Sequence, residues 1–422
     1  MIFITKNPTK NVKHEGFIGS ARWTLDEQGV LTIGSGHVNH HVYASWPWSH
    51  LAKDIKKVDG RASLVIHQCA AQAFARLPYV QIIDLSGWQL VDVTNLNGMF
   101  FKCPNLSTLI LPEWDTSKVV KMNAMFEECK SLKHLDLSSW DTSSLKQINW
   151  MFAKCYALEK LNLSTWTTPN LQMLDLAFYH CHALQELDLS SWTITHVHSL
   201  YSVFEQCTAL ESLAISTWNT ALVQDMSGLF EECSMLKNID LSKWNTSHVR
   251  RMDSLFYGCH SLVDLDLSNW DTSQVESMVF MFYKCHNLKQ LDLSKWSTSQ
   301  VYQTNCMFDH CTSLQDLDLS NWDTQSLVEA NHMFKDCTTL TSLNLAHWNT
   351  QNLDTIQNMC AQCKSLEYLN LSDWTLQNIT HKSDCLAECH QLKEIIYPQD
   401  RHFALLRFFK ATKWPHLSKW WF

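Results

Sequence analysis

The chain has 422 residues, with 19 Trp, 10 Tyr and 19 Phe but only 10 Gly and 8 Pro, which excludes collagen-like and Pro/Gly-rich disordered classes. At 45% hydrophobic and 18% charged residues, it has the material for a large core. Its 42 acidic and 33 basic residues give a net charge of −9, and without a long basic run nucleic acid is not an expected partner.

The opening MIFITKNPTK offers five largely apolar residues before it turns polar. No stretch of the chain approaches the roughly 20 apolar residues that a bilayer-spanning helix needs. We therefore predict no transmembrane segment, and we identify no intact signal peptide at this end.

Residues 1–61 are expected to form an N-terminal capping region with a β-hairpin. Its two strands, Trp23–Leu25 and Val30–Ile33, flank a turn that contains glycine. The segment Ser45–Trp48 follows as a loop anchor. Four nearby histidines are interpreted as part of a polar loop rather than as a metal site: His37, His40, His41 and His50.

A repeat of 26 residues fills most of the remaining chain. Tryptophan recurs at this spacing at positions 88, 114, 140, 166, 192, 218, 244, 270, 296, 322, 348 and 374. Cysteine recurs in the same phase at positions 103, 129, 155, 181, 207, 233, 259, 285, 311, 337, 363 and 389. Two gapless ladders in register indicate a repeat architecture.

One unit, beginning at Cys259, reads CHSLVDLDLSNWDTSQVESMVFMFYKC. Leu265 and Leu267 alternate with Asp266, which predicts a short strand. Val275, Met278 and Met281 then recur every three residues, which predicts a short α- or 3₁₀-helix that the preceding Asp-Thr-Ser would cap.

Such a unit cannot bury its apolar stripe alone, so neighbouring units must stack around one continuous core. Strands joined through helices lie parallel, and their connections are right-handed. We therefore predict an α/β solenoid of about twelve 26-residue coils over residues 62–397. Residues 62–79 form a degenerate first half-coil.

The motif LxxLDLSxWDTSxVxxMxxMFxxC resembles the repeat of the BspA-like leucine-rich-repeat surface proteins. The W-x-L-D-x-x-G-x-L-T-I opening also resembles their N-terminal caps. The resemblance covers about four-fifths of the chain and implies a right-handed leucine-rich-repeat-like solenoid with a parallel concave sheet. It further implies a bacterial protein, displayed on the cell surface or secreted, that acts as an adhesin.

Residues 398–422 have no repeat phase and are aromatic and basic. We expect them to form a helical C-terminal cap over the last coil, because an uncapped coil would expose its core. A tail that contacts a membrane surface or a partner is the alternative, since Trp and basic residues suit an interface.

The cysteine and tryptophan columns are explained by packing before chemistry. The cysteines are expected to point inward as unpaired thiols, because one regular column defines no unique disulfide pairing. Zinc is not expected, and no other metal site or cofactor is predicted. The tryptophans are expected to be mostly buried, with an exposed aromatic stripe for sugars or another surface as the alternative.

The outward position between the last two strand leucines carries the candidate binding residues: Asp136, Asp188, Asp240, Asp266, Asp292 and Asp318. Neighbouring carboxylates about 5 Å apart would repel and raise their average pKa. The serines two residues on, and lysines in alternate coils, are the candidates that offset this repulsion. Three interpretations stay open: a solvated acidic face, a docking face for a cationic or hydrogen-bonding partner, and a cation site.

No phosphate loop, nucleophile elbow or HExxH motif occurs, so no catalytic residue is predicted. Our first hypothesis is a non-enzymatic interaction protein whose sheet face binds a protein or glycan, including host extracellular matrix or cell surface. The second is an intracellular or injected scaffold or effector, in keeping with many free thiols and a cytoplasmic location. The third is an enzyme with a site in the first 60 residues.

Overall fold

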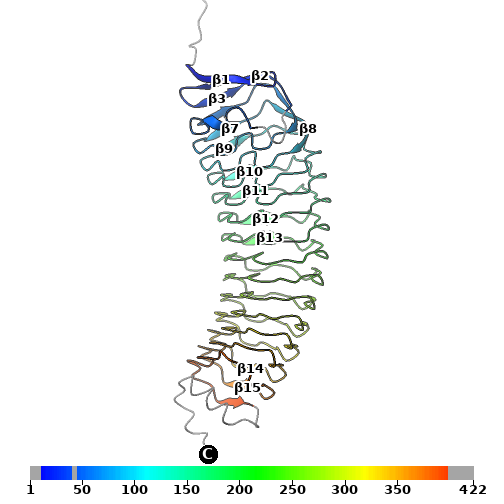
Figure 1. The fold of residues 1–422 in the computed structure, drawn as a ribbon, viewed down its shortest axis with the longest axis vertical. Coiled ribbons are helices and arrows are strands. Elements are labelled where there is room, and N and C mark those ends of the chain that lie inside the picture. Colours follow the sequence, from blue (N-terminus) through cyan, green and yellow to red (C-terminus); the bar gives the residue numbers. More distant parts are fainter. Residues whose placement is uncertain (1–10, 40–44, 398–422) are drawn as a thin grey trace, which may run out of the picture. The chain divides into compact units, whose positions relative to one another are not determined.

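The computed structural model describes residues 11–39 and 45–397, and the fold is a parallel β-solenoid of about 14 turns. The chain comprises two compact units, residues 1–196 and 197–422. Figure 1 shows the stacked coils within each unit. The expected C-terminal cap at 398–422 lies outside the described residues. No helix among the described residues is long and apolar enough to cross a membrane.

The first unit opens with antiparallel strands. β1 (Val12–Ile18) pairs with β2 (Ala21–Asp26), and β2 pairs with β3 (Val30–Ile33). From β3 the sheet continues in parallel through β5 (Lys57–Asp59), β7 (Ile82–Asp84) and β9 (Thr108–Ile110). The change from antiparallel to parallel pairing is where the solenoid begins.

A second sheet of the first unit runs through the other side of the coils. It contains β4 (Gly36–Asn39), β6 (Leu64–Cys69) and β8 (Trp88–Asn95), all parallel. Single parallel bridges extend it along Asn95, Lys121, Gln147 and Met173. The remaining strands of the unit are β10 (His134–Asp136), β11 (Lys160–Asn162) and β12 (Glu186–Asp188).

The second unit repeats the short parallel strands of the solenoid: β13 (Ser212–Ala214), β14 (Ser342–Asn344), β15 (Tyr368–Asn370) and β16 (Glu394–Ile396). β14, β15 and β16 pair in parallel with Leu343 beside Leu369 and Leu369 beside Ile395. Each strand residue pairs with the residue 26 positions further on, so one sequence repeat forms one coil of the solenoid.

The α/β fold class is wrong, because the segments expected to be helical are turns. Among the described residues the only regular helix is a 3₁₀ turn, η1 (Ser49–Leu51). Phe280, inside the expected helix, has a φ of 59°, and Lys284, just after it, has a φ of 60°, whereas an α-helix needs φ near about −63° throughout. Phe282 N–H donates to Met307 O in the next coil at 2.9 Å. The backbone therefore bonds between coils instead of along a helix.

The Asp-Thr-Ser segment does not cap a helix either. Asp271 Oδ1 accepts the backbone N–H of Ser273 at 2.9 Å, which closes an Asx turn. The buried Thr272 hydroxyl donates to Ser297 O in the next coil at 2.8 Å. The motif recurs because it turns the chain and joins neighbouring coils.

The coil interior is a set of stacked rings. The twelve repeat tryptophans are at most 4% exposed, which confirms that their column is buried. Trp218 and Trp244 stack with ring centroids 6.2 Å apart, and Phe256 and Phe282 stack at 5.6 Å. Offset stacks at such spacings are favourable beyond the apolar area that they bury.

None of the sixteen cysteines forms a disulfide, and fifteen of them are buried. The column cysteines do more than fill space. Cys259 Sγ donates to Phe230 O at 3.1 Å, and Cys285 Sγ donates to Phe256 O at 3.1 Å. Each of these carbonyls also accepts a backbone N–H of its own coil, so the thiol adds a second hydrogen bond that joins neighbouring coils. The sequence pattern alone does not predict this bond.

Candidate functional site: the strand face and the cysteine corner

The strand face is the surface on which the outward side chains of the short strands lie. All six predicted aspartates are exposed on it. Asp136 ends β10 and Asp188 ends β12 in the first unit, whereas the other four occupy the equivalent positions in the second unit. The structure therefore brings together Asp240, Asp266, Asp292 and Asp318, in four consecutive coils.

Each of these carboxylates is held by the serine two residues later. Asp266 Oδ1 accepts the Ser268 backbone N–H at 3.0 Å and the Ser268 hydroxyl at 2.7 Å. Asp292 accepts the same two bonds from Ser294, at 3.0 and 2.6 Å. This Asx arrangement fixes the direction of the carboxylate while leaving it in contact with solvent.

The pKa of every predicted aspartate is lowered, so the expected rise from mutual repulsion is wrong in direction. Hydrogen bonds from the Ser268 hydroxyl and N–H are the main causes that lower the pKa of Asp266, and they outweigh the opposing charge of Asp292. Lys295 lowers the pKa of Asp292 further. The predicted role of the serines is confirmed, whereas of the lysines only Lys243 and Lys295 lower the pKa of an aspartate in this row. The row is therefore ionised at neutral pH.

The strand face of the second unit also has a hollow of about 640 Å³. Besides Asp240 and Asp266, its lining includes the carboxylate of Asp264. Only one lysine lines it: Lys237, which pairs with Glu211 at 3.1 Å. The hollow is therefore predominantly acidic.

A second set of chemically active residues escaped the sequence analysis. We call it the cysteine corner: for each column cysteine, the residue five positions before it, the two residues just before it and the one after it. The residue just before the cysteine has a positive φ, for example 60° at Lys284 and 64° at His310. Unlike the buried columns, the corner has different residues in successive coils. This variation was the signal in the sequence from which the corner could have been found.

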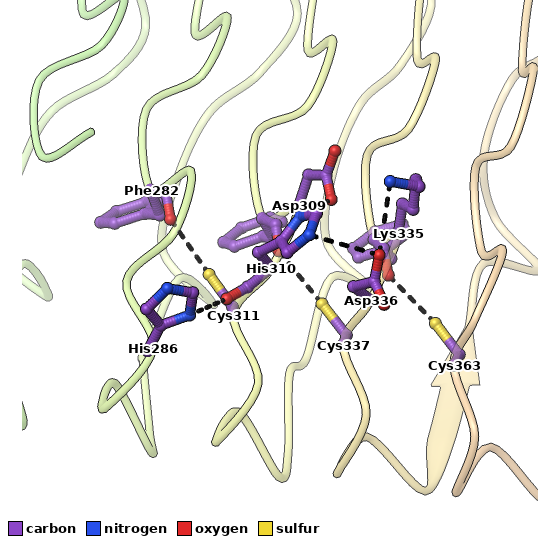
Figure 2. Close-up of polar contacts among 11 residues, drawn as sticks. Phe282, His286, Asp309, His310, Cys311, Lys335, Asp336, Cys337 and Cys363 are labelled. Carbon is purple, nitrogen blue, oxygen red and sulfur yellow. Dashed lines mark hydrogen bonds and ion pairs between the residues drawn. The ribbon is translucent and has the colours of Figure 1, made fainter. Parts of the chain in front are cut away.

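Two groups of corner residues stand out in the second unit. Burial, aided by the charges of Glu205 and Glu232, raises the pKa of Glu231 to about 7. Further along, His310 Nδ1 lies 2.6 Å from Asp309 Oδ1, and His310 Nε2 lies 3.5 Å from Asp336 Oδ2 (Figure 2). Burial raises the pKa of Asp309, which is 4% exposed.

These features define a leucine-rich parallel solenoid whose second unit has an acidic strand face and a variable corner. Residues 69–192, 172–293 and 277–397 match the family described as "Mycoplasma protein of unknown function, DUF285". The matches span most of the chain, which therefore belongs to this family. No curated protein matches the chain.

Several solved structures resemble this chain at low identity. A leucine-rich cell surface protein from Faecalibacterium prausnitzii A2-165 shares 15% identity over 95% of this chain and 98% of its own, with a TM-score of 0.37. A leucine-rich repeat protein from Eubacterium ventriosum shares 15% over 79% and 96%, with a TM-score of 0.31. An LRR protein from Leptospira interrogans shares 16% over 82% and 84%, with a TM-score of 0.29. Scores this low carry no functional argument.

Proposed function

We propose that the chain is a non-enzymatic interaction protein that binds a cationic protein segment on the strand face of its second unit. The observation that carries this proposal is the row of four serine-held, ionised carboxylates beside the acidic hollow. Fixed charges lose little freedom on binding, so a lysine- or arginine-rich segment gains more from them than from mobile carboxylates. Asp136 and Asp188 offer the same group in the first unit.

A docking face fits these residues better than a cation site. A metal ion needs ligand atoms that converge on one point. Among the described residues, three such atoms lie within 4.8 Å of one another only at Asp309, His310 and Asp336, none of which is on the strand face. The strand-face carboxylates instead form a row, which suits an elongated partner.

We further propose that the protein acts at a bacterial surface or after secretion, as an adhesin of the BspA-like type. The repeat motif supports this proposal. The absence of disulfides among sixteen cysteines favours the alternative of an intracellular or injected scaffold, because the thiols of extracellular proteins are commonly oxidised to disulfides. Protease treatment of intact cells separates the two: loss of the protein supports surface display, and full protection contradicts it.

Binding to the strand face can be tested with a fluorescent peptide of alternating lysine and threonine. We expect Asp266→Lys combined with Asp292→Lys to weaken binding about 10-fold or more, and added salt to weaken wild-type binding. The matched control is Asp271→Lys with Asp323→Lys, which makes the same charge change at exposed aspartates in the Asx turns after the tryptophans. Equal affinities of the two double variants for the peptide would contradict the docking proposal, and the aspartate row would then be a solvated acidic face.

A further inference from the structure

The corner cluster of the second unit consists of Asp309, His310, Lys335 and Asp336, on two adjacent coils. One histidine stands between two carboxylates, with Asp309 at its Nδ1 and Asp336 at its Nε2 (Figure 2). Lys335 Nζ lies 3.3 Å from the same Asp336 oxygen. The cluster is part-buried, and Asp309 is almost completely so.

The two contacts cannot both be hydrogen bonds of a neutral ring to ionised carboxylates. A carboxylate only accepts, so the 2.6 Å contact to Asp309 places the ring proton on Nδ1. The lone pair of Nε2 then faces a second acceptor, Asp336 Oδ2, at 3.5 Å. The repulsion between the Nε2 lone pair and Asp336 Oδ2 is removed when a positive charge lies between them. A proton on Nε2 or a bound metal ion can supply this charge.

The spacing suits a metal ion. Two ligands of a tetrahedral Zn²⁺ with bonds of about 2.0–2.1 Å lie about 3.3–3.4 Å apart, close to the observed Nε2–Oδ2 distance of 3.5 Å. A hydrogen bond from the far ring nitrogen to a carboxylate is the usual support of a metal-binding histidine. Asp309 provides that support here. A nitrogen ligand beside a carboxylate favours a transition metal over Ca²⁺ or Mg²⁺.

The backbone around His310 is held in place from both sides. Its N–H donates to Lys335 O at 2.8 Å, and its carbonyl lies 3.0 Å from His286 Nδ1. Because carbonyl oxygens only accept, His286 donates this bond. A ligand on such a fixed frame loses little freedom when it binds an ion.

We propose that His310 Nε2 and the Asp336 carboxylate bind a divalent transition metal of the Zn²⁺ class, with Asp309 positioning the histidine. Water completes the coordination. Lys335 is the competitor, because its ammonium compensates Asp336 when no ion is bound and must move aside when one is. The sequence analysis predicted no metal site, since the ligands are joined by stacking rather than by a spacing motif.

The test is isothermal titration calorimetry of the chelator-treated full chain with Zn²⁺ alone. We expect one site, abolished by His310→Ala and by Asp336→Asn. Asp309→Asn should weaken it about 10- to 100-fold, as loss of a supporting carboxylate does elsewhere. Lys335→Met should strengthen it. The control His390→Ala removes an exposed histidine that pairs with Glu388 at 2.9 Å, and it should change nothing.

The cysteines need separate exclusion, because thiols also bind Zn²⁺. Replacing Zn²⁺ by Co²⁺ distinguishes them, since cobalt bound to thiolate has an intense near-ultraviolet charge-transfer band. We expect no such band, in keeping with the burial of the column thiols. Circular dichroism of each variant verifies folding. Absence of Zn²⁺ binding by the wild type, unchanged binding by folded His310→Ala, or a thiolate band would each overturn the proposal.

Discussion

The strand face and the cysteine corner are made by the same coils but follow opposite rules. On the strand face, an aspartate with its serine two residues later repeats through four coils of the second unit, with the same backbone hydrogen bond from the serine N–H each time. At the corner, the two residues before the cysteine differ in successive coils: Glu231 and Glu232, Tyr257 and Gly258, Tyr283 and Lys284, Asp309 and His310. A residue that recurs in every coil is explained by the structure of the coil. A half-buried residue that occurs in only one coil is a candidate for a function at that place.

The largest effect is expected from breaking a column that every coil needs. Phe256 is fully buried and stacks on Phe230 and Phe282 at 5.5 and 5.6 Å. Replacing it with alanine leaves a cavity that the rigid neighbouring coils cannot fill, so we expect Phe256→Ala to cost about 3–5 kcal/mol of unfolding free energy. Urea denaturation followed by tryptophan fluorescence measures this cost.

The matched control is Phe280→Ala, which removes the same ring from the corner. Phe280 is half-buried and makes edge contacts with Tyr257 and Tyr283. We expect this variant to lose about 1 kcal/mol or less. Similar losses in both variants would contradict the division between repeated interior and variable corner.

The sequence could predict the interior because periodic residues have one explanation. The sequence was sufficient to find the 26-residue repeat. It also placed the leucines, tryptophans and cysteines inward and the aspartates outward. The spacing of Val275, Met278 and Met281 wrongly predicted a helix, because a turn at Phe280 with positive φ gives the same inward spacing. The cluster of Asp309, His310 and Asp336 could not be seen, because only stacking of two coils brings Asp336 to His310.

The next effect concerns the cysteine column. Cys259→Ala removes a buried sulfur and leaves Phe230 O without the thiol that bonds to it at 3.1 Å. Phe230 O keeps the hydrogen bond from Cys233 N–H at 3.0 Å. We therefore expect a cost of about 1–3 kcal/mol, from the small cavity and the loss of the thiol hydrogen bond together. The same change at half-exposed Cys306 should cost less than about 0.5 kcal/mol. Denaturation curves of the two variants compare interior with corner directly, and a larger loss at Cys306 would contradict it.

A smaller effect, dependent on pH, is expected at the corner residue Glu231. Its pKa is raised from 4.5 to about 7 in the folded chain. The folded state therefore holds a proton that the unfolded state releases, so this contribution is fully present below pH 4.5 and is lost as pH rises through 7. Because the side chain is partly solvated, we expect only about 1 kcal/mol.

Glu231→Gln should remove this part of the pH dependence and make the chain more stable than wild type at pH 8. Thermal melts at pH 5 and pH 8 measure the difference. Glu211→Gln makes the same charge change on the strand face, where Glu211 pairs with Lys237, and serves as the control. A wild-type slope that survives Glu231→Gln would show that another group carries it.

The smallest effect is expected on the strand face, where the groups are exposed. The Ser268 hydroxyl is the largest cause that lowers the pKa of Asp266, whereas at Asp318 the backbone N–H of Ser320 is the largest. Ser268→Ala should therefore raise the pKa of Asp266 more than Ser320→Ala raises that of Asp318. A lowered pKa stabilises the folded chain above the unfolded value of 3.8, and this contribution is lost as pH falls through the folded pKa. Carboxyl ¹³C titration measures both shifts, and equal shifts would mean that the hydroxyl has no special part in holding the row.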